Sequence, residues 1–261
     1  MADIPYYLKR VNNRTASPIE ASVGAYYYVF TKDLSTSVYR SASAIIELPD
    51  SGDVNVYGTD GYKRNAYISM GIRGYWTNNK GSFYGGLDLG MVCENNLVWH
   101  PAYYDATDRI GHGNDPDEAS YTEFTTDSQT KKVKLTITPL TSTSVQMQVD
   151  YLNASGVLLN GKTRTYVINR ITTARTWKQY YRFGSLVPCT TGHDNRQDST
   201  YLVGAKFTQA RLNTSSGYVT WGIEPSNTQS PVELAFTYGH PKCQVTTINS
   251  DGEVFNIDHW A

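Results

Sequence analysis

One segment of the chain places aromatic side chains directly before a loop rich in short polar side chains. It runs from Trp99 to Glu118 and opens with the letters WHPAYY. An aromatic face can pack on the C–H side of a sugar ring, while short polar side chains bond its hydroxyl groups. We therefore predict a carbohydrate-binding site here. The residues expected to contact the carbohydrate are Trp99, Tyr103, Tyr104, Asp105, His112, Asn114, Asp115 and Asp117.

Two other loops are secondary candidates for the same kind of site. One surrounds Trp76 and Asn78, and the other follows Cys189. The second contains Asp194, Asn195 and Arg196. Tryptophan and tyrosine also serve as packing residues in β proteins, so a core role for any one of these aromatics stays open.

The polar loop also concentrates oxygen ligands that could hold a calcium ion. These ligands are Asp108, Asn114, Asp115, Asp117 and Glu118. Calcium takes roughly six to eight oxygens, but the spacing here does not match an EF-hand loop. Such residues are also typical of ordinary turns. We therefore expect no bound metal and no cofactor, with calcium as the alternative.

Acid–base chemistry is a second alternative for these loops. His112 with Asp115 or Glu118 could form an acid–base pair, and Asp194 with Glu224 could form the paired carboxylates of a glycosidase. The chain contains no GxSxG, HExxH, GxGxxG or P-loop motif. We therefore assign no catalytic residue, and a polysaccharide lyase or glycoside hydrolase remains the alternative to a binding protein.

The charge balance restricts the class of partner. Lys and Arg total 23 and Asp and Glu total 24, which gives a net charge of −1. A nucleic-acid-binding protein is expected to show a basic excess, so we expect no nucleic-acid partner. No stretch approaches the roughly 18 apolar residues of a membrane span, and residues 1–18 lack a signal-peptide core. These features predict a cytoplasmic protein without a membrane span.

The three cysteines predict thiols rather than a structural disulfide. Cys93, Cys189 and Cys243 lie far apart and form no CxxC pair. A chain of this length buries a sizeable core and does not need a covalent bridge. One bridge with one leftover thiol is the alternative.

Alternating apolar residues predict many short strands. Residues 133–137 and 145–151 alternate with period two and read as a hairpin, joined by a turn at 141–144. Further strands are expected at 66–72, 87–91 and 232–238.

Three other segments have less regular patterns. A strand ending near Ile168 should follow the turn at 153–156, with Asn160-Gly161 as a second tight turn. A phase slip near Thr208 predicts a β-bulge or bend. Residues 172–181 fit either a short helix or a strand.

Together these elements predict an all-β fold. We expect residues 1–261 to form a single domain, built as a two-sheet antiparallel sandwich of the jelly-roll type. The 21 tyrosines fit both β-sheet packing and ligand contact.

The order of these segments resembles the concanavalin-like jelly rolls. The resemblance is carried by LDLGM at 87–91, WHP at 99–101 and the hairpin at 133–151, within residues 71–212. Lectins, carbohydrate-binding modules and some polysaccharide lyases share that fold. The Tyr-rich, near-neutral composition is also similar to that of the cytoplasmic defence lectins of mushrooms.

The resemblance implies a lectin for a neutral glycan, with a role as a defence toxin. Weak single sites gain avidity in an oligomer, which implies a homodimer. A non-catalytic protein-interaction or structural β domain is a further alternative.

Overall fold

The computed structural model describes most of the chain, and all structural statements below concern that part. The described residues are 25–31, 39–58, 64–78, 81–94, 98–105, 110–111, 125–169, 171, 174–188, 199–222, 232–238, 242–249 and 252–258.

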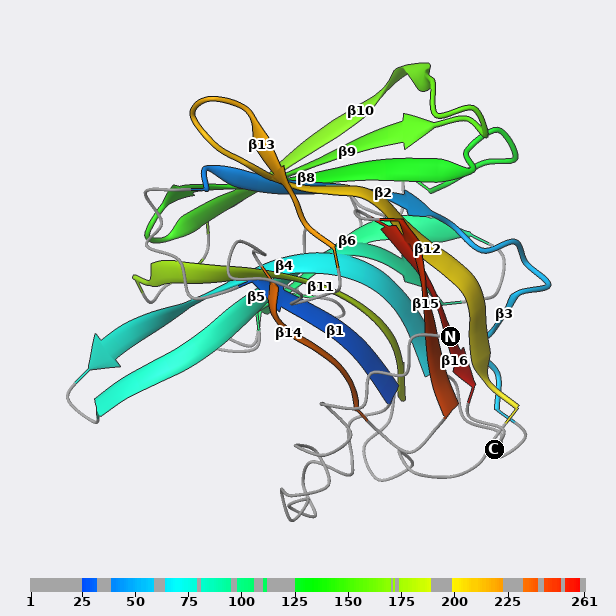
Figure 1. Ribbon diagram of the computed structural model, residues 1–261, viewed down its shortest axis with the longest axis horizontal. Coiled ribbons are helices and arrows are strands. Elements are labelled where there is room, and N and C mark those ends of the chain that lie inside the picture. The colour runs from blue at the N-terminus through cyan, green and yellow to red at the C-terminus, as the bar shows by residue number, and fades with distance from the viewer. Residues whose placement is uncertain are drawn as a thin grey trace.

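The strands form two antiparallel sheets that stack as two layers (Figure 1). Sheet A has seven strands in the order β14-β1-β11-β4-β5-β6-β7. Their bounds are β14 Val232–Tyr238, β1 Ala25–Thr31, β11 Thr176–Pro188, β4 Arg64–Asn78, β5 Gly81–Cys93, β6 Trp99–Asp105 and β7 Ile110–Gly111.

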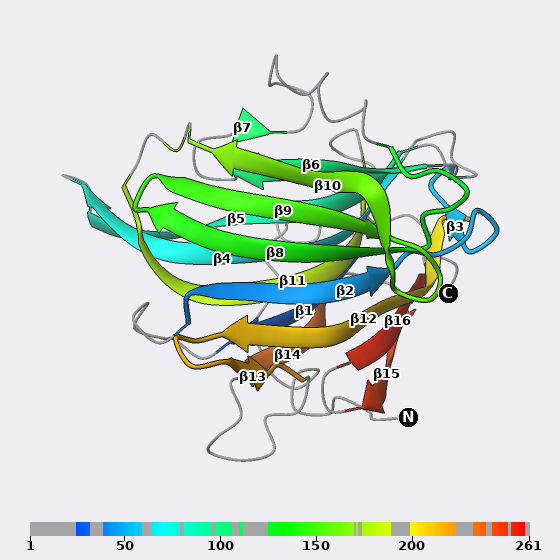
Figure 2. The same ribbon diagram turned by 90° about the horizontal axis from the view of Figure 1, so that it is seen from above.

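Sheet B has nine strands, seven of them in the order β10-β9-β8-β2-β12-β16-β15 (Figure 2). The other two strands, β13 and β3, both pair with β12. The bounds are β10 Leu158–Ile168, β9 Ser144–Leu152, β8 Lys132–Thr141, β2 Ser41–Glu47, β12 Tyr201–Asn213, β16 Gly252–Asp258, β15 Lys242–Asn249, β13 Tyr218–Thr220 and β3 Val54–Asn55. The predicted all-β, two-sheet sandwich is therefore confirmed.

Period-two alternation explains where the core lies. In β4, Ile68, Met70 and Ile72 are buried against the other sheet, and Leu87 and Leu89 do the same in β5. Successive side chains of a strand point to opposite faces, so the residues between them line the outer face of sheet A. The expected strands at 66–72, 87–91, 133–137, 145–151 and 232–238 are all present.

Three local predictions have different outcomes. Residues 176–188 form β11, so the strand alternative is correct and the helix is not. Asn160-Gly161 does not end a strand, because β10 continues through it with a register shift between Leu158 and Thr163. The predicted irregularity near Thr208 is present as a register shift between Thr208 and Arg211.

A fully buried ion pair joins the two sheets. Arg182 of β11 points into the core, where its Nε and Nη2 donate to the two Glu253 oxygens of β16 at 2.7 and 2.9 Å. Both side chains have zero exposure. The guanidinium also lies over the Trp221 ring, 4.6 Å from its centroid. This pair is a polar connection between the two sheets through the interior.

The predictions of free thiols and of no membrane span can be compared with the structure only for the described residues. Cys93 is buried and forms no disulfide bond, while Cys189 lies outside the described residues. No helix found in the described part of the chain is long and apolar enough to cross a membrane.

Candidate functional site

The start of the predicted carbohydrate site belongs largely to the core. Trp99 and Tyr103 are 4% and 6% exposed and point between the sheets. Asp105 is 1% exposed, and Arg175 Nη2 donates to both of its carboxylate oxygens at 2.7 Å. Because β6 alternates, only Tyr104 of this group faces outward, with 43% of its surface exposed.

Most of the remaining predicted residues are not in the described part of the chain. His112, Asn114, Asp115, Asp117, Asp194, Asn195 and Arg196 lie outside the described residues. So do the alternative ligands and acid–base residues Asp108, Glu118 and Glu224. Trp76 and Asn78 are not in a loop but in β4, where they pair with Phe83 and Gly81 of β5. No group of metal-ligating side chains occurs among the residues that were described.

A different set of side chains meets on the outer face of sheet A. We call it the Asp88 face and define it by residues of β1, β4, β5, β6 and β11. These residues are Tyr28, Phe30, Tyr67, Arg73, Asp88, Tyr104, Gln179, Tyr181 and Phe183. It lies on the side of sheet A away from sheet B, because its members alternate with the core residues of the same strands.

One row of directly paired residues crosses this face. Phe30 pairs with Tyr181, Tyr181 with Gly71, Gly71 with Asp88, and Asp88 with Tyr104. Side chains at paired positions lie on the same face and close enough to touch. The register therefore places an aromatic side chain two strands away from a carboxyl group, with a glycine between them.

Glycine at position 71 is what allows Tyr181 to reach Asp88. A Cβ at Gly71 would lie 2.2 Å from Cζ of Tyr181, and one at Gly86 would lie 2.6 Å from its hydroxyl oxygen. The ring therefore lies flat across β4 in space that any side chain would fill. Its hydroxyl donates a hydrogen bond to Oδ1 of Asp88.

Burial changes the ionisation of both groups. Desolvation raises the pKa of Asp88 to about 6, and the negative charge of Asp105 adds to this, while the hydrogen bond from Tyr181 acts in the opposite direction. Burial and the neighbouring Asp88 charge raise the pKa of Tyr181 well above its usual value. Tyr181 thus remains a hydrogen-bond donor while Asp88 can change its protonation state close to neutral pH.

Polar and aromatic groups fix the rest of the face. Arg73 Nε donates to Gln179 Oε1 at 2.7 Å, and its guanidinium lies 3.9 Å from the Phe30 ring centroid. Gln179 in turn donates to the Thr31 carbonyl at 2.8 Å. Phe30, Tyr181 and Phe183 form a buried cluster separate from the main core. The carboxyl group is therefore supported by side chains that already have fixed partners.

This arrangement suits proton transfer. A carboxyl group with a pKa near the working pH can accept a proton in one step and return it in the next. Strongly perturbed pKa values cluster at functional sites. A cation at Arg73 and an amide at Gln179 lie on the same face as further polar groups.

Asp88 was not among the predicted site residues, although it lies in the LDLGM segment at 87–91. In LDLGM the aspartate lies between two core leucines, so it must point to the opposite face. Gly86 and Gly90 flank it at the same period, which leaves that face without bulky neighbours on β5. A lone carboxylate in a row of glycines was the available signal.

The comparisons with known proteins yield solved structures only. No family model matches the chain, and no curated protein matches it. A scytalido-glutamic peptidase, solved with a peptide-based transition-state analogue, is similar over 90% of this chain and 98% of its own, at 8% identity and a TM-score of 0.50. SCP-B, a member of the eqolisin family of peptidases solved with the tripeptide Ala-Ile-His, covers the same shares at 8% identity and a TM-score of 0.49.

This comparison shows a β-sandwich fold and corrects the functional prediction. The prediction of a carbohydrate-binding lectin is contradicted, because the scytalido-glutamic peptidase that matches at a TM-score of 0.50 is a peptidase and not a lectin. The alternatives, a carbohydrate-cleaving enzyme and a non-catalytic interaction domain, do not match this neighbour either. The aromatic residues misled the functional prediction, because Trp99 and Tyr103 are buried in the core and are not exposed for ligand contact.

Proposed function

We propose that this chain is a hydrolase of peptide bonds, with Asp88 as its general acid–base group. The observation that carries the proposal is the Asp88 carboxyl, which has a pKa of about 6 and is held by Tyr181 on a glycine-lined part of sheet A. The solved peptidase with a peptide-based transition-state analogue has a similar fold and supports the choice of substrate class.

In the proposed reaction Asp88 acts in its ionised form first. Its carboxylate accepts a proton from a water molecule, and the water oxygen bonds to the carbonyl carbon of the peptide. The carbon–nitrogen bond then breaks, and the proton passes from Asp88 to the leaving amine. Tyr181 keeps the carboxyl oriented through its hydrogen bond. All bonds and protons balance with water as the only co-substrate.

The substrate would lie along the exposed part of the Asp88 face. Tyr104 pairs directly with Asp88 and is 43% exposed, and Tyr75 on the same face of β4 is 45% exposed. Exposed aromatic rings beside a protonatable carboxyl suit contact with apolar side chains of a peptide. The proposed partner is therefore an unfolded or extended polypeptide.

The test is cleavage of a mixed peptide library followed by mass spectrometry across pH. We expect cleavage by the parent protein, with a rate that falls as pH drops below about 6 and Asp88 becomes protonated. Asp88→Asn should abolish it. Asp50→Asn is the matched control, because Asp50 is an exposed loop carboxylate paired with Lys131. No cleavage by the parent, or undiminished cleavage by Asp88→Asn, would refute the proposal.

Two sequence predictions accompany the proposal as further hypotheses. A homodimer is testable by light scattering, and a cytoplasmic location by fractionation of the source cells. Neither is needed for chemistry at Asp88, because the groups that carry it come from one chain.

A further inference from the structure

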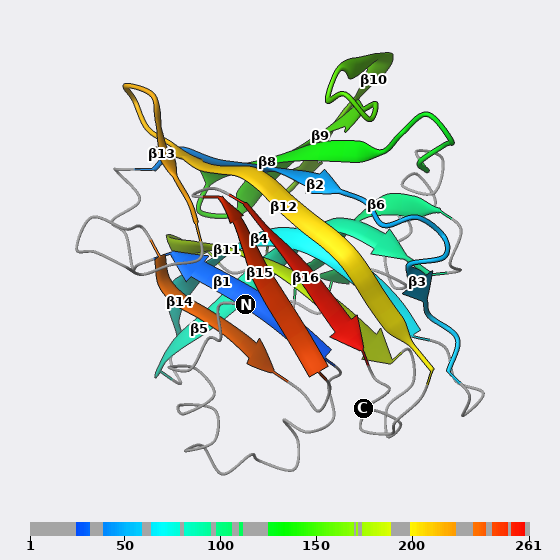
Figure 3. The ribbon, with the colours of Figure 1, turned by 45° about the vertical axis from the view of Figure 1, so that its right-hand side comes forward.

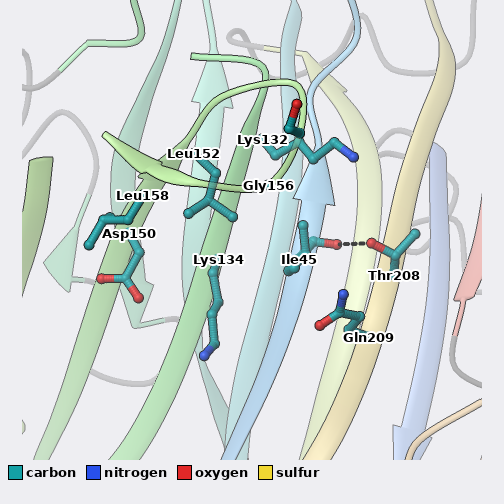
Figure 4. Close-up of a pocket in the computed structure, with 10 residues that line it drawn as sticks. Ile45, Lys132, Lys134, Asp150, Leu152, Gly156, Leu158, Thr208 and Gln209 are labelled. Atoms are coloured by element: carbon teal, nitrogen blue, oxygen red, sulfur yellow. Dashed lines mark hydrogen bonds between the residues drawn. The ribbon is translucent and has the colours of Figure 1, made fainter. Parts of the chain in front are cut away.

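A cavity of about 420 Å³ lies on the outer face of sheet B (Figure 4). The Asp88 face lies on the other sheet, sheet A. Strands β2, β8, β9 and β12 form its floor, and the loop from β9 to β10 forms one wall. Its volume falls within the range of small-molecule sites. The wall is well defined: the backbone N–H groups of Asn153 and Gly156 donate to the carbonyls of Val157 and Asn153 at 3.0 and 2.9 Å.

Two opposite charges line the cavity, and neither forms an ion pair with a described residue. Lys134 of β8 pairs in register with Asp150 of β9, yet the structure gives no ion pair between them. The Asp150 carboxylate accepts hydrogen bonds from neutral groups, Gln148 Nε2 at 3.0 Å and Thr163 Oγ1 at 2.9 Å. Lys134 makes no hydrogen bond to any described residue. By contrast, the neighbouring Lys132 is neutralised by Glu47 at 3.0 Å.

The rim opposite the loop contains a strained residue. Gln209 has φ of 50°, and it is the single non-glycine residue with positive φ in the described part of the chain. It occupies the irregularity of β12 between Thr208 and Arg211. Left-handed backbone is costly for such a residue and is found where the surrounding structure enforces it, often at ligand sites. The bulge presents the Gln209 amide at the cavity wall.

Apolar surface completes the cavity. Leu152 is 5% exposed and Leu158 is 50% exposed, and both line it beside the charged pair. A ligand that pairs with Lys134, with Asp150 and with the two leucines needs an anionic group, a cationic group and an apolar group within a small volume.

We propose that this cavity binds a free α-amino acid with an apolar side chain. Its carboxylate would bind Lys134 and the Gln209 amide, its ammonium group would bind Asp150, and its side chain would pack on Leu152 and Leu158. Free amino acids and larger zwitterions share this chemistry, and the cavity size favours the smaller class. The inference does not depend on chemistry at Asp88.

The test is calorimetric titration with three compounds that differ in one charge each. L-Leucine carries both charges, leucinamide lacks the carboxylate, and N-acetyl-leucine lacks the ammonium group. We expect L-leucine to bind at least about tenfold more tightly than either blocked compound, because each charge-assisted hydrogen bond contributes at least that factor. Absence of leucine binding, or equal binding of all three, would overturn the proposal.

Two variants test which side chain binds each charged group of leucine. Lys134→Gln should remove the preference for leucine over leucinamide, and Asp150→Asn should remove the preference over N-acetyl-leucine. Lys131→Gln is the matched control, since Lys131 pairs with Asp50 and does not line the cavity. Melting temperatures identify any variant that fails to fold. If Asp150→Asn does not fold, the result for Lys134→Gln alone tests the assignment. Unchanged selectivity in folded Lys134→Gln, or the same loss in Lys131→Gln, contradicts the assignment.

Discussion

Replacing Glu253 by glutamine should destabilise the sandwich far more than an average substitution does. The change keeps the side-chain size but removes the charge, and it leaves one oxygen to accept from Arg182. At present two donors of Arg182 use both Glu253 oxygens, at 2.7 and 2.9 Å. The side chains have zero exposure, so water cannot replace the lost partner. Breaking such a buried pair from one side costs about 3–5 kcal/mol.

Removing both charges should cost much less. In the double variant Arg182→Met, Glu253→Leu neither charge of this ion pair remains, and the side chains fill similar space against Phe207 and Trp221. Apolar replacement of a whole buried pair is often neutral or stabilising by about 1–4 kcal/mol. Even now Nη1 of Arg182 and Nε1 of Trp221 have no hydrogen-bond partner, so the polar arrangement already includes unsatisfied groups.

The assay is urea unfolding at neutral pH, followed by fluorescence of the buried tryptophans. A shifted midpoint with an unchanged slope reports a change in stability and not in the unfolded state. Glu253→Gln should be the least stable variant, and the double variant should be close to the parent. A cost below about 1 kcal/mol for Glu253→Gln, or equal costs for the single and double variants, would show that no uncompensated charge is created and would refute the reasoning.

Four further predictions concern the Asp88 face and the need for a metal. Asp88→Asn should stabilise the protein at pH 7, because a pKa raised from 3.8 to about 6 means that the folded state disfavours the ionised carboxyl, by up to roughly 3 kcal/mol. For the same reason the parent should lose stability as pH rises from about 4 to above 6, and melting curves of Asp88→Asn should lack this dependence. Gly71→Ala should displace the Tyr181 ring and destabilise by about 1–3 kcal/mol, whereas Gly52→Ala, with no atom within 4 Å of the new methyl group, should melt like the parent. Chelation with EDTA should leave peptide cleavage and melting temperature unchanged, and a large drop restored by calcium would contradict the prediction that no metal is needed.

Local periodicity was sufficient to predict the sandwich, because the alternating apolar residues of each strand show which of its faces is buried. Residues 133–151 are the clearest case: the alternation and the turn are both present in one short segment, and the structure contains that hairpin as β8 and β9. The helix alternative at 172–181 arose because the few apolar residues there fit both periods. Pairing with β1 and β4 decides in favour of a strand.

The candidate site could not be predicted in the same way, since its parts are far apart in the sequence. Asp88 meets Tyr181 from 93 residues away, and Asp105 meets Arg175 from 70 residues away. Asp105 follows an aromatic cluster and precedes a polar loop, and this position favours the prediction of a carbohydrate contact. Only the register of β6 and the distant arginine reveal that it is a buried ion-pair partner.

The position of β12 has a consequence for how the protein is made. This strand pairs with β2 along one part of its length and with β16 along another, so segments from near both ends of the chain meet on it (Figure 3). Lys206 pairs with Glu47 and also with Val254. During synthesis β2 therefore emerges well before β12, and β12 emerges before β16 exists. Such non-local pairing makes folding slow, and the waiting strands expose unpaired edges that can join those of other chains. Expression at low temperature or with chaperones should therefore raise the yield of folded protein.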